Sequence, residues 1–396
     1  MNLKQYDCIL ELIKSALWQP RKLTVDEKVY IELSRHAITT LVAPVLSSLE
    51  MGAELREKWK VAIIHQIANY SNYKYVQSNL PITVPYVILK GTSASQYYDH
   101  PEYRTCGDID IMPTREDFQT VCAQLIEGGY RECNTHEKDE FGRHRTFLKN
   151  GIIIEVHAFF ALFNEKQKAE YLDDLIIANI NPSHVLPDMI NGLVILEHIN
   201  QHLETGIGLR QIIDWMMFVE KCLPDEKWDG FYSLAQNSGL DTLAVVVTRM
   251  CEKYLGLPAR NWCNIANDEL CKQLMEYVLE CGNFGRKQKD ENHTGALILS
   301  FQRSPIAVFS LLQRRGLINW KSVKKHRWLR PFAWLYQLIR YTKKGIGRDH
   351  SISKLRQEYE LSKARDLLFS KLKVKQTSKG LVVLKNGEYV KTHRIP

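Results

Sequence analysis

Long apolar runs and closely spaced cysteine pairs are missing from this chain of 396 residues. No stretch approaches about 18 uninterrupted apolar residues, so we expect no membrane-spanning helix. The first residues lack a charged-then-apolar pattern, so we expect no signal peptide. The nine cysteines are scattered without a C-x-x-C pair or a zinc-type spacing, which predicts free thiols in a cytoplasmic protein. A hydrophobic content of 45% suffices for a packed core in two to three domains.

Acidic residues are missing from one part of the chain. Eleven basic residues and no acidic one lie between Leu311 and Arg348, although the formal net charge of the whole chain is only +8. Segment 305–348 is also rich in tryptophan, phenylalanine and tyrosine, and from Trp328 onward its apolar residues keep helical spacing. Two interpretations are equally favoured, a helix lying peripherally on an anionic membrane surface and a helix packed on the protein with a solvated basic rim. Contact with nucleic acid is a third, less favoured interpretation.

Two aspartates alternate with apolar residues in the stretch GDIDIM, residues 107–112. In a β-strand, residues i and i+2 lie on one face, so Asp108 and Asp110 are predicted to point together while Ile109 and Ile111 enter a core. Adjacent carboxylates repel each other, and a divalent cation between them relieves the repulsion. Oxygen ligands favour Mg²⁺ or Mn²⁺. Taken alone, the tripeptide favours a strand edge that bears two solvated aspartates; a Lys-Gly turn upstream and a third carboxylate downstream shift the preference to a metal site.

A third carboxylate, Glu155, lies in the apolar run GIIIEVHAFF, residues 151–160. The β-branched composition predicts a strand, and a lone glutamate inside it is costly to bury unpaired. Glu155 is therefore either an outward residue at an edge or a metal ligand, with His157 on its face. Beside Asp108 and Asp110, it would complete a three-carboxylate site for two metal ions, which stabilise the attacking and leaving oxygens of an in-line displacement.

A turn upstream of the aspartates offers phosphate-binding groups. Residues 84–89 read as a short buried strand, and Lys90-Gly91-Thr92-Ser93 follows as a turn that can open a helix. Lys90 and Arg104 are candidates for phosphate contact, because cations near a metal site offset triphosphate charge; each is also interpretable as a solvated loop charge. The Ser93 hydroxyl fits either a phosphate contact or an N-cap of the following helix.

Two polar pairs at i, i+4 spacing lie farther along the chain, His198 with His202 and Arg210 with Asp214. Such pairs share one face of a helix, and the second pair can form an ion pair. The histidine spacing is compatible with zinc, but Glu197 precedes the first histidine, so the H-E-x-x-H motif is not formed. The favoured interpretation of the histidines, from spacing alone, is a polar seam between packed helices.

Helical periodicity dominates the chain outside the two strand-rich parts. One hairpin is predicted around Lys149-Asn150-Gly151 and another around Asn386-Gly387. The fold class is therefore α+β, a small mixed sheet embedded in mostly helical flanks. The predicted regions are an N-terminal helical region at 1–80, an α/β core at 81–165, a helical domain at 166–300, the basic aromatic segment at 301–350, and a C-terminal helix and hairpin at 351–396.

Together these motifs resemble a known family. Over about residues 30–290, the chain resembles bacterial nucleotidyltransferase-like proteins of the DNA polymerase beta-type superfamily. The motifs that carry the resemblance are Lys90-Gly91, Tyr98, Pro101, Arg104, Gly107 to Asp110, Glu155-x-His157, His198-x-x-x-His202 and residues 208–215 (GLRQIIDW). The resemblance implies Mg²⁺-dependent transfer of a nucleoside monophosphate from an NTP to an acceptor that the motifs do not identify. It also implies that His202 and Arg210 border the nucleotide cleft.

Three functions are compatible with these motifs. In the preferred one, Asp108 and Asp110 bind two metal ions, Glu155 binds one of them and helps deprotonate the acceptor, and Lys90 with the backbone amides of residues 91–93 holds phosphates. The second is a phosphotransferase that moves the γ-phosphate on the same fold. The third is a non-catalytic scaffold at a membrane surface, which the intact set of three acids disfavours.

Overall fold

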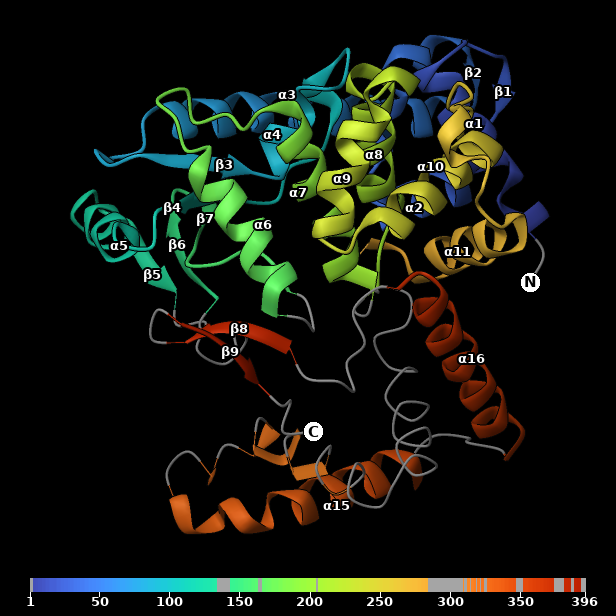
Figure 1. The fold of residues 1–396 in the computed structure, drawn as a ribbon. Coiled ribbons are helices and arrows are strands. Elements are labelled where there is room, and N and C mark those ends of the chain that lie inside the picture. The colour runs from blue at the N-terminus through green and yellow to red at the C-terminus, as the bar shows by residue number, and fades with distance from the viewer. Residues whose placement is uncertain are drawn as a thin grey trace. The chain divides into compact units, whose positions relative to one another are not determined.

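The computed structural model describes residues 3–133, 143–162, 166–203 and 206–283 continuously, and shorter stretches within 309–346, 352–373 and 381–392. The chain divides into two compact units. The first comprises residues 1–287 with 372–375 and 382–390, and the second comprises 288–371 with 376–381 and 391–396. Helices and a small mixed sheet build the first unit (Figure 1), which confirms the α+β class.

A five-stranded mixed sheet carries the acidic motifs. Its strand order is β3-β4-β7-β6-β5, and the strands are β3 (Tyr86–Leu89), β4 (Ile109–Pro113), β5 (Arg131–Cys133), β6 (His144–Lys149) and β7 (Ile152–His157). β4 and β7 pair in parallel, whereas β3 with β4, β5 with β6 and β6 with β7 pair antiparallel. The strand of the aspartates and the strand of Glu155 are therefore direct neighbours.

The hairpin between β6 and β7 forms at the predicted turn. Asn150 and Gly151 both have positive φ, 50° and 80°, as a two-residue type I′ turn requires. This turn sets the register of β6 on β7, which pairs His144 with His157 and Thr146 with Glu155.

One face of the sheet is apolar and covered. Ile109, Ile111, Ile154 and Val156 belong to a buried cluster that also includes residues of α5 (Phe118–Glu127), and Tyr73 and Val76 of α3 pack against the same cluster. Because Asp110 and Glu155 alternate with these residues along β4 and β7, the two carboxylates lie on the opposite face of the sheet.

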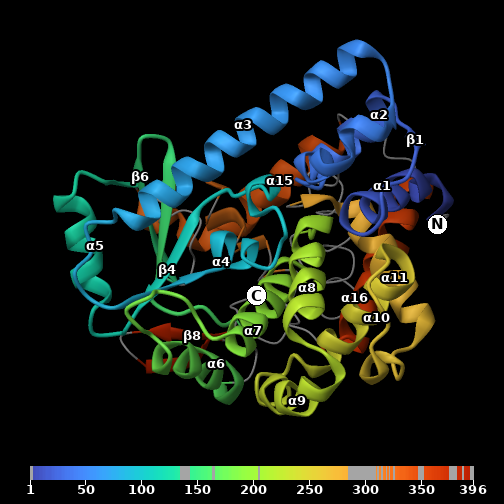
Figure 2. The same cartoon turned by 90° about the horizontal axis from the view of Figure 1, so that it is seen from above.

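Helices before the sheet form the N-terminal part of the first unit. They are η1 (Leu3–Tyr6), α1 (Asp7–Leu17), α2 (Glu27–Arg35), the 3-10 helix η2 (Thr39–Ser48) and α3 (Ala53–Ser78), with the short parallel strands β1 (Leu23–Thr24) and β2 (Leu49–Glu50) between them. Figure 2 shows α3 running from these helices toward the sheet. Trp59, Ile63 and Gln66 form its buried stripe.

Helices also surround the polar face of the sheet. Two short ones, α4 (Gly91–Ser95) and η3 (Pro101–Tyr103), lie between β3 and β4. After β7 come α6 (Lys166–Ala178), α7 (Asp188–Leu203), α8 (Leu209–Cys222), α9 (Trp228–Asn237), α10 (Asp241–Leu255) and α11 (Asp268–Cys281), with the 3-10 turns η4 (Asp225–Lys227) and η5 (Asn261–Cys263). α7 and α8 are buried almost throughout, so these two helices form the centre of the helical part.

The described part of the second unit is mostly helical. It includes η7 (Arg327–Phe332), α15 (Ala333–Ile346) and α16 (Ile352–Lys371). The predicted C-terminal hairpin, most of which belongs to the first unit, is present as the two-stranded sheet of β8 (Leu381–Lys385) and β9 (Glu388–Thr392), while its turn at 386–387 lies outside the described residues. Among the described helices, none has the length and apolarity that crossing a membrane requires.

Candidate active site

The three predicted carboxylates lie together on the polar face of the sheet. Asp110 and Glu155 are register partners on the parallel strands β4 and β7, and Asp108 directly precedes β4. All three line one cavity of about 170 Å³. Asp110 is fully buried, whereas solvent reaches 21% of the Glu155 side chain.

His157 joins the carboxylates from the end of β7. Its Nε2 lies 2.8 Å from Asp110 Oδ1 and 3.7 Å from Glu155 Oε2. Asp110, Glu155 and His157 each present one ligand atom, and these atoms lie within 4.8 Å of one another. Burial, followed by the positive charge of Lys90, lowers the pKa of His157 well below its usual range, so the imidazole is neutral and able to bind a metal ion. Sequence analysis placed Asp108 in the metal site; Asp108 lines the same cavity but lies outside this group of three.

The donor atoms fit a divalent cation. Asp110 Oδ2 and His157 Nδ1 are buried without a hydrogen-bond partner among the described residues, and an unpaired buried polar atom is costly. Burial and then repulsion from Asp110 raise the pKa of the Glu155 carboxyl to about 8, and the same two causes raise the pKa of Asp108. A cation between these groups would give the unpaired buried atoms a partner and would lower the raised carboxyl pKa values. Carboxylate oxygens suit Mg²⁺ or Mn²⁺.

Lys90 reaches the carboxylates from the turn after β3. It has an unusual positive φ of 48° for a residue other than glycine, and its side chain is buried. Its Nζ lies 2.8 Å from Asp110 Oδ1. Burial opposes the charge on the ammonium group, but Asp110, Asp108 and Glu155 outweigh it and raise the Lys90 pKa. Lys90 is therefore a charged group inside the acidic cluster.

Of the other residues in the predicted phosphate-binding turn, Gly91 borders the cavity, whereas the hydroxyls of Thr92 and Ser93 bind neighbouring helices. Gly91 lines the cavity together with Lys90. The Thr92 hydroxyl donates instead to Gln77 Oε1 of α3, and the Ser93 hydroxyl donates to Asn191 Oδ1 of α7 at 3.1 Å. The two hydroxyls thus attach α4 to its neighbouring helices, because both side chains are buried where the turn becomes helix.

Arg104 forms a buried ion pair that spacing along a helix did not predict. Its Nε and Nη2 donate to the two oxygens of Asp214 in α8, at 2.8 and 2.6 Å. The Tyr98 hydroxyl donates to Asp214 Oδ1 at 2.8 Å. Sequence analysis paired Asp214 with Arg210 and assigned Arg104 to phosphate. In the structure Arg104 lines the cavity, but much of its guanidinium is engaged in holding the loop before β4 against α8.

The polar faces of α7 and α8 line the same cavity. His198, Gln201 and His202 of α7 and Arg210 of α8 all border it, so the histidine pair is more than a seam between helices. Burial, followed by the charge of His202, lowers the pKa of His198 well below its usual range. Arg210 Nη1 donates to Thr105 O at 3.2 Å, which places its guanidinium beside the loop that leads to Asp108.

Sequence reasoning missed His144, the first residue of β6, and Arg143, which directly precedes this strand. Both line the cavity. His144 Nε2 lies 3.5 Å from Glu155 Oε1, and Arg143 Nη1 donates to Gln201 Oε1 at 3.0 Å. The position of His144 could have been predicted from the hairpin. Counting residue pairs outward from the Asn150-Gly151 turn places His144 opposite His157.

The small mixed sheet brings acidic side chains from the adjacent strands β4 and β7 to a cavity lined by α7 and α8, which agrees with the resemblance to nucleotidyltransferases seen in the sequence. The family model described as "Uncharacterised nucleotidyltransferase" matches residues 26–256, more than half of the chain. The chain belongs to this family. The match contains the whole five-stranded sheet and every residue of the cavity, whereas the basic segment lies beyond it. No curated protein and no solved structure matches the chain.

Proposed function

We propose that this nucleotidyltransferase is metal-dependent and transfers a nucleoside monophosphate from an NTP to a hydroxyl or phosphate oxygen of an acceptor. The observation that carries the proposal is the group formed by Asp110, Glu155 and His157, with a buried carboxylate oxygen that has no hydrogen-bond partner among the described residues. Asp110, Glu155 and His157, with Asp108 beside them, would hold Mg²⁺ or Mn²⁺. When bound, such an ion polarises phosphate oxygens and helps to orient the reacting groups.

Charges around the cavity suit a triphosphate. Four cationic side chains border it, Lys90, Arg104, Arg143 and Arg210, against three carboxylates. Arg104 is paired with Asp214 and Lys90 with Asp110. We expect Lys90, Arg143 and Arg210, all of which border the cavity, to contact phosphate oxygens once a metal ion balances the carboxylate charge. Charge-assisted hydrogen bonds to phosphate are among the strongest that proteins make.

We expect Glu155 to receive the proton of the acceptor. Burial and Asp110 raise the pKa of this carboxyl in the metal-free protein, and a cation held beside it would lower that pKa and keep the carboxylate ionised as a general base. His144 Nε2 at 3.5 Å provides a further site for the proton. The acceptor oxygen forms a bond to the α-phosphorus as the bond from that phosphorus to the bridging oxygen breaks. Pyrophosphate leaves, and the acceptor's proton passes to a Glu155 oxygen.

Because the acceptor is unidentified, binding provides the first test. A non-hydrolysable NTP with Mn²⁺ should raise the melting temperature of the wild-type protein, since a ligand that binds only the folded state stabilises it. Asp110→Asn should remove the Mn²⁺-dependent part of this rise. Asp99→Asn, at a surface aspartate paired with Lys221, is the matched control and should respond as the wild type does. A wild-type protein that no NTP stabilises in the presence of metal would contradict the proposal.

Turnover provides the second test and separates the two transfer reactions. Incubation with labelled NTPs, Mg²⁺ and fractionated cell extract as the source of acceptor should release pyrophosphate. Asp110→Asn should lower this rate by at least about a hundredfold, the scale on which removal of one electrostatic stabiliser acts. Release of a nucleoside diphosphate in place of pyrophosphate would assign γ-phosphoryl transfer instead.

A further inference from the structure

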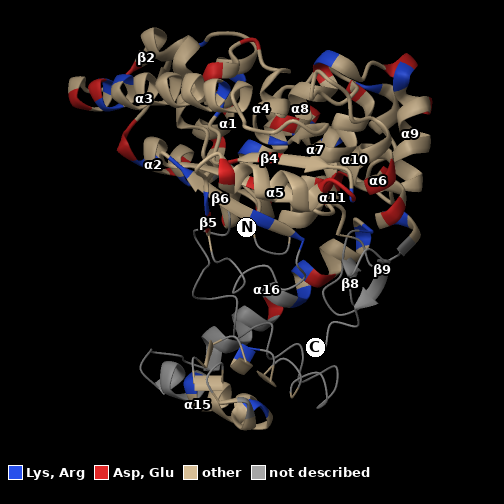
Figure 3. Cartoon of the chain, turned by 90° about the vertical axis from the view of Figure 1, so that its left-hand side faces the viewer, with Lys and Arg blue, Asp and Glu red and all other residues tan. Residues whose placement is uncertain are grey.

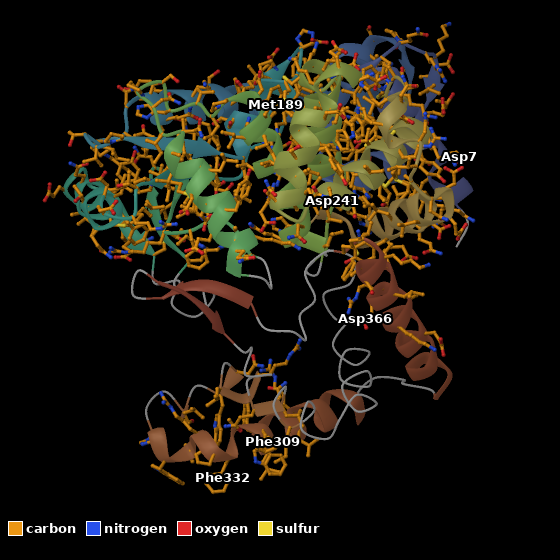
Figure 4. The ribbon with its side chains drawn as sticks, in the orientation of Figure 1. Asp7, Met189, Asp241, Phe309, Phe332 and Asp366 are labelled. Atoms are coloured by element: carbon orange, nitrogen blue, oxygen red, sulfur yellow. The ribbon has the colours of Figure 1, made fainter. Side chains whose placement is uncertain are left out.

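An exposed apolar face lies on the basic segment 305–348, outside the residues that the family model matches. Phe332, Leu335 and Ile339 are 51%, 40% and 46% exposed, and residues spaced three and four apart share one side of a helix. Trp328, in the preceding turn η7, is 70% exposed. Figure 4 shows the side chain of Phe332 pointing away from the rest of the second unit.

The opposite face of α15 is the one that packs. Ala333 and Gln337 are buried, and Gln337 Oε1 accepts a hydrogen bond from Asn319 Nδ2 at 3.0 Å. The ring of Trp320 stacks on Tyr336 with centroids 5.0 Å apart. A helix of a globular protein usually buries its apolar stripe; here part of the aromatic and apolar surface packs, whereas Phe332, Leu335 and Ile339 are exposed.

Further contacts prevent α15 from rotating its apolar face inward. Gln313 Nε2 donates to Arg330 O at 2.6 Å, and Gln313 Oε1 accepts from the backbone N–H of Trp334 at 3.0 Å. Gly316 lies so close to Ala333 that a Cβ added to the glycine would be 1.8 Å from Ala333 O. The outward orientation of Phe332, Leu335 and Ile339 is therefore set by packing on the other side.

The charge of the segment indicates what covers this face. Eleven basic residues and no acidic one lie between Leu311 and Arg348, and α15 carries basic but no acidic residues (Figure 3). A second copy of the chain would bring two equally basic faces together, which like-charge repulsion opposes. Nucleic acid would meet the cations, but the aliphatic side chains Leu335 and Ile339 have no ring on which a base can stack. Anionic lipid matches both the cations and the aliphatic side chains.

We propose that η7 and α15 dock on an anionic membrane surface. Phe332, Leu335 and Ile339 enter the boundary between headgroups and acyl chains, and the flanking basic side chains contact anionic headgroups. Trp328 lies at the level of the headgroups, where tryptophan is enriched.

The test uses the full chain and sedimentation with vesicles. Wild type should bind vesicles of phosphatidylcholine with phosphatidylserine, and not vesicles of phosphatidylcholine alone. Phe332→Ser with Leu335→Ser and Ile339→Ser should weaken binding at least about tenfold, because each substitution removes apolar surface that the membrane would bury. The matched control is Ile64→Ser with Ile265→Ser, at isoleucines of the first unit that are 65% and 83% exposed, which should bind as wild type.

A second variant tests the charge while keeping the apolar face. Arg330→Glu with Arg340→Glu should weaken binding to the mixed vesicles and make it less sensitive to salt. Circular dichroism spectra and melting curves like those of wild type would show that each variant is folded.

Several outcomes would overturn the proposal. One is a wild-type protein that does not bind the mixed vesicles, and another is a serine triple variant that binds them unchanged. A third is a wild-type protein that is dimeric and a triple variant that is monomeric but still binds lipid, which would assign the face to contact with a second copy of the chain. A fourth is a triple variant that no longer binds single-stranded RNA but still binds vesicles as wild type does, which would assign the apolar face to nucleic acid.

Discussion

Replacing Glu155 by glutamine should stabilise the metal-free protein at alkaline pH. Burial and Asp110 raise the pKa of the Glu155 carboxyl from 4.5 to about 8. Between these two values the folded state holds a proton that the unfolded state has released. The free energy of unfolding therefore falls as pH rises through this window. A glutamine side chain does not titrate, so only the protein with the natural glutamate carries this pH-dependent loss.

The size of the effect follows from the pKa shift. A rise from 4.5 to about 8 corresponds to about 5 kcal/mol, at about 1.4 kcal/mol per pKa unit. Solvent reaches 21% of the Glu155 side chain, and screening by water reduces the expected difference to a few kcal/mol. At about pH 9 the glutamine variant should melt several degrees above wild type, whereas near pH 5 the two should melt together, because both then carry a neutral side chain at this position.

The assay is a series of melting curves from about pH 5 to 9, first with a chelator and then with Mg²⁺. Added Mg²⁺ should restore the stability of wild type at alkaline pH and leave Glu155→Gln nearly unchanged, because the ion compensates for the carboxylate charge. Glu226→Gln, in the exposed turn η4, is the control and should follow wild type at every pH. A glutamine variant that melts below wild type at alkaline pH without metal would refute the reasoning, since the carboxylate would then stabilise the fold.

Two further predictions concern the helices that close the cavity. Asp214→Asn should lower the free energy of unfolding by about 3–5 kcal/mol, because it leaves the buried Arg104 charge uncompensated. Urea unfolding measures this loss. Replacing Arg104 by methionine in the same protein should restore part of the lost stability. Gly192→Ala in α7 should destabilise by about 1–3 kcal/mol, because its Cβ would be 2.3 Å from the ring of Phe218. Gly230→Ala in α9, where no atom lies within 4 Å of the added Cβ, should instead raise the melting temperature slightly; equal effects of the two alanines would contradict the close packing of α7 on α8.

Local signals made the order of elements predictable. The β6–β7 hairpin follows from the Asn150-Gly151 turn, and α5 ends where Gly128-Gly129 interrupts it, because turn chemistry acts within a few residues. The strand that bears Asp110 follows from the alternation of aspartate and isoleucine. For each of these elements, the residues that determine the structure are neighbours in the chain.

The partners of the buried polar groups were not predictable in this way. Asp110 meets His157 from 47 residues away, Arg104 meets Asp214 from 110, and Arg143 meets Gln201 from 58. A helix-face rule suggested Arg210 for Asp214, since that rule compares only residues of one helix. A buried charge instead pairs with whichever opposite charge packing brings near it, because leaving it unpaired is too costly.

The sequence by itself determined which side chains carry charge, where strands and helices begin, and which face of each strand is polar, because side-chain alternation and turn chemistry are local. Only the tertiary structure decided that β7, rather than β5 or β6, lies beside β4, and so that Glu155 stands opposite Asp110. That neighbour relation depends on how α5 and the β6–β7 hairpin pack on the sheet, and packing over such separations is a property of the whole fold.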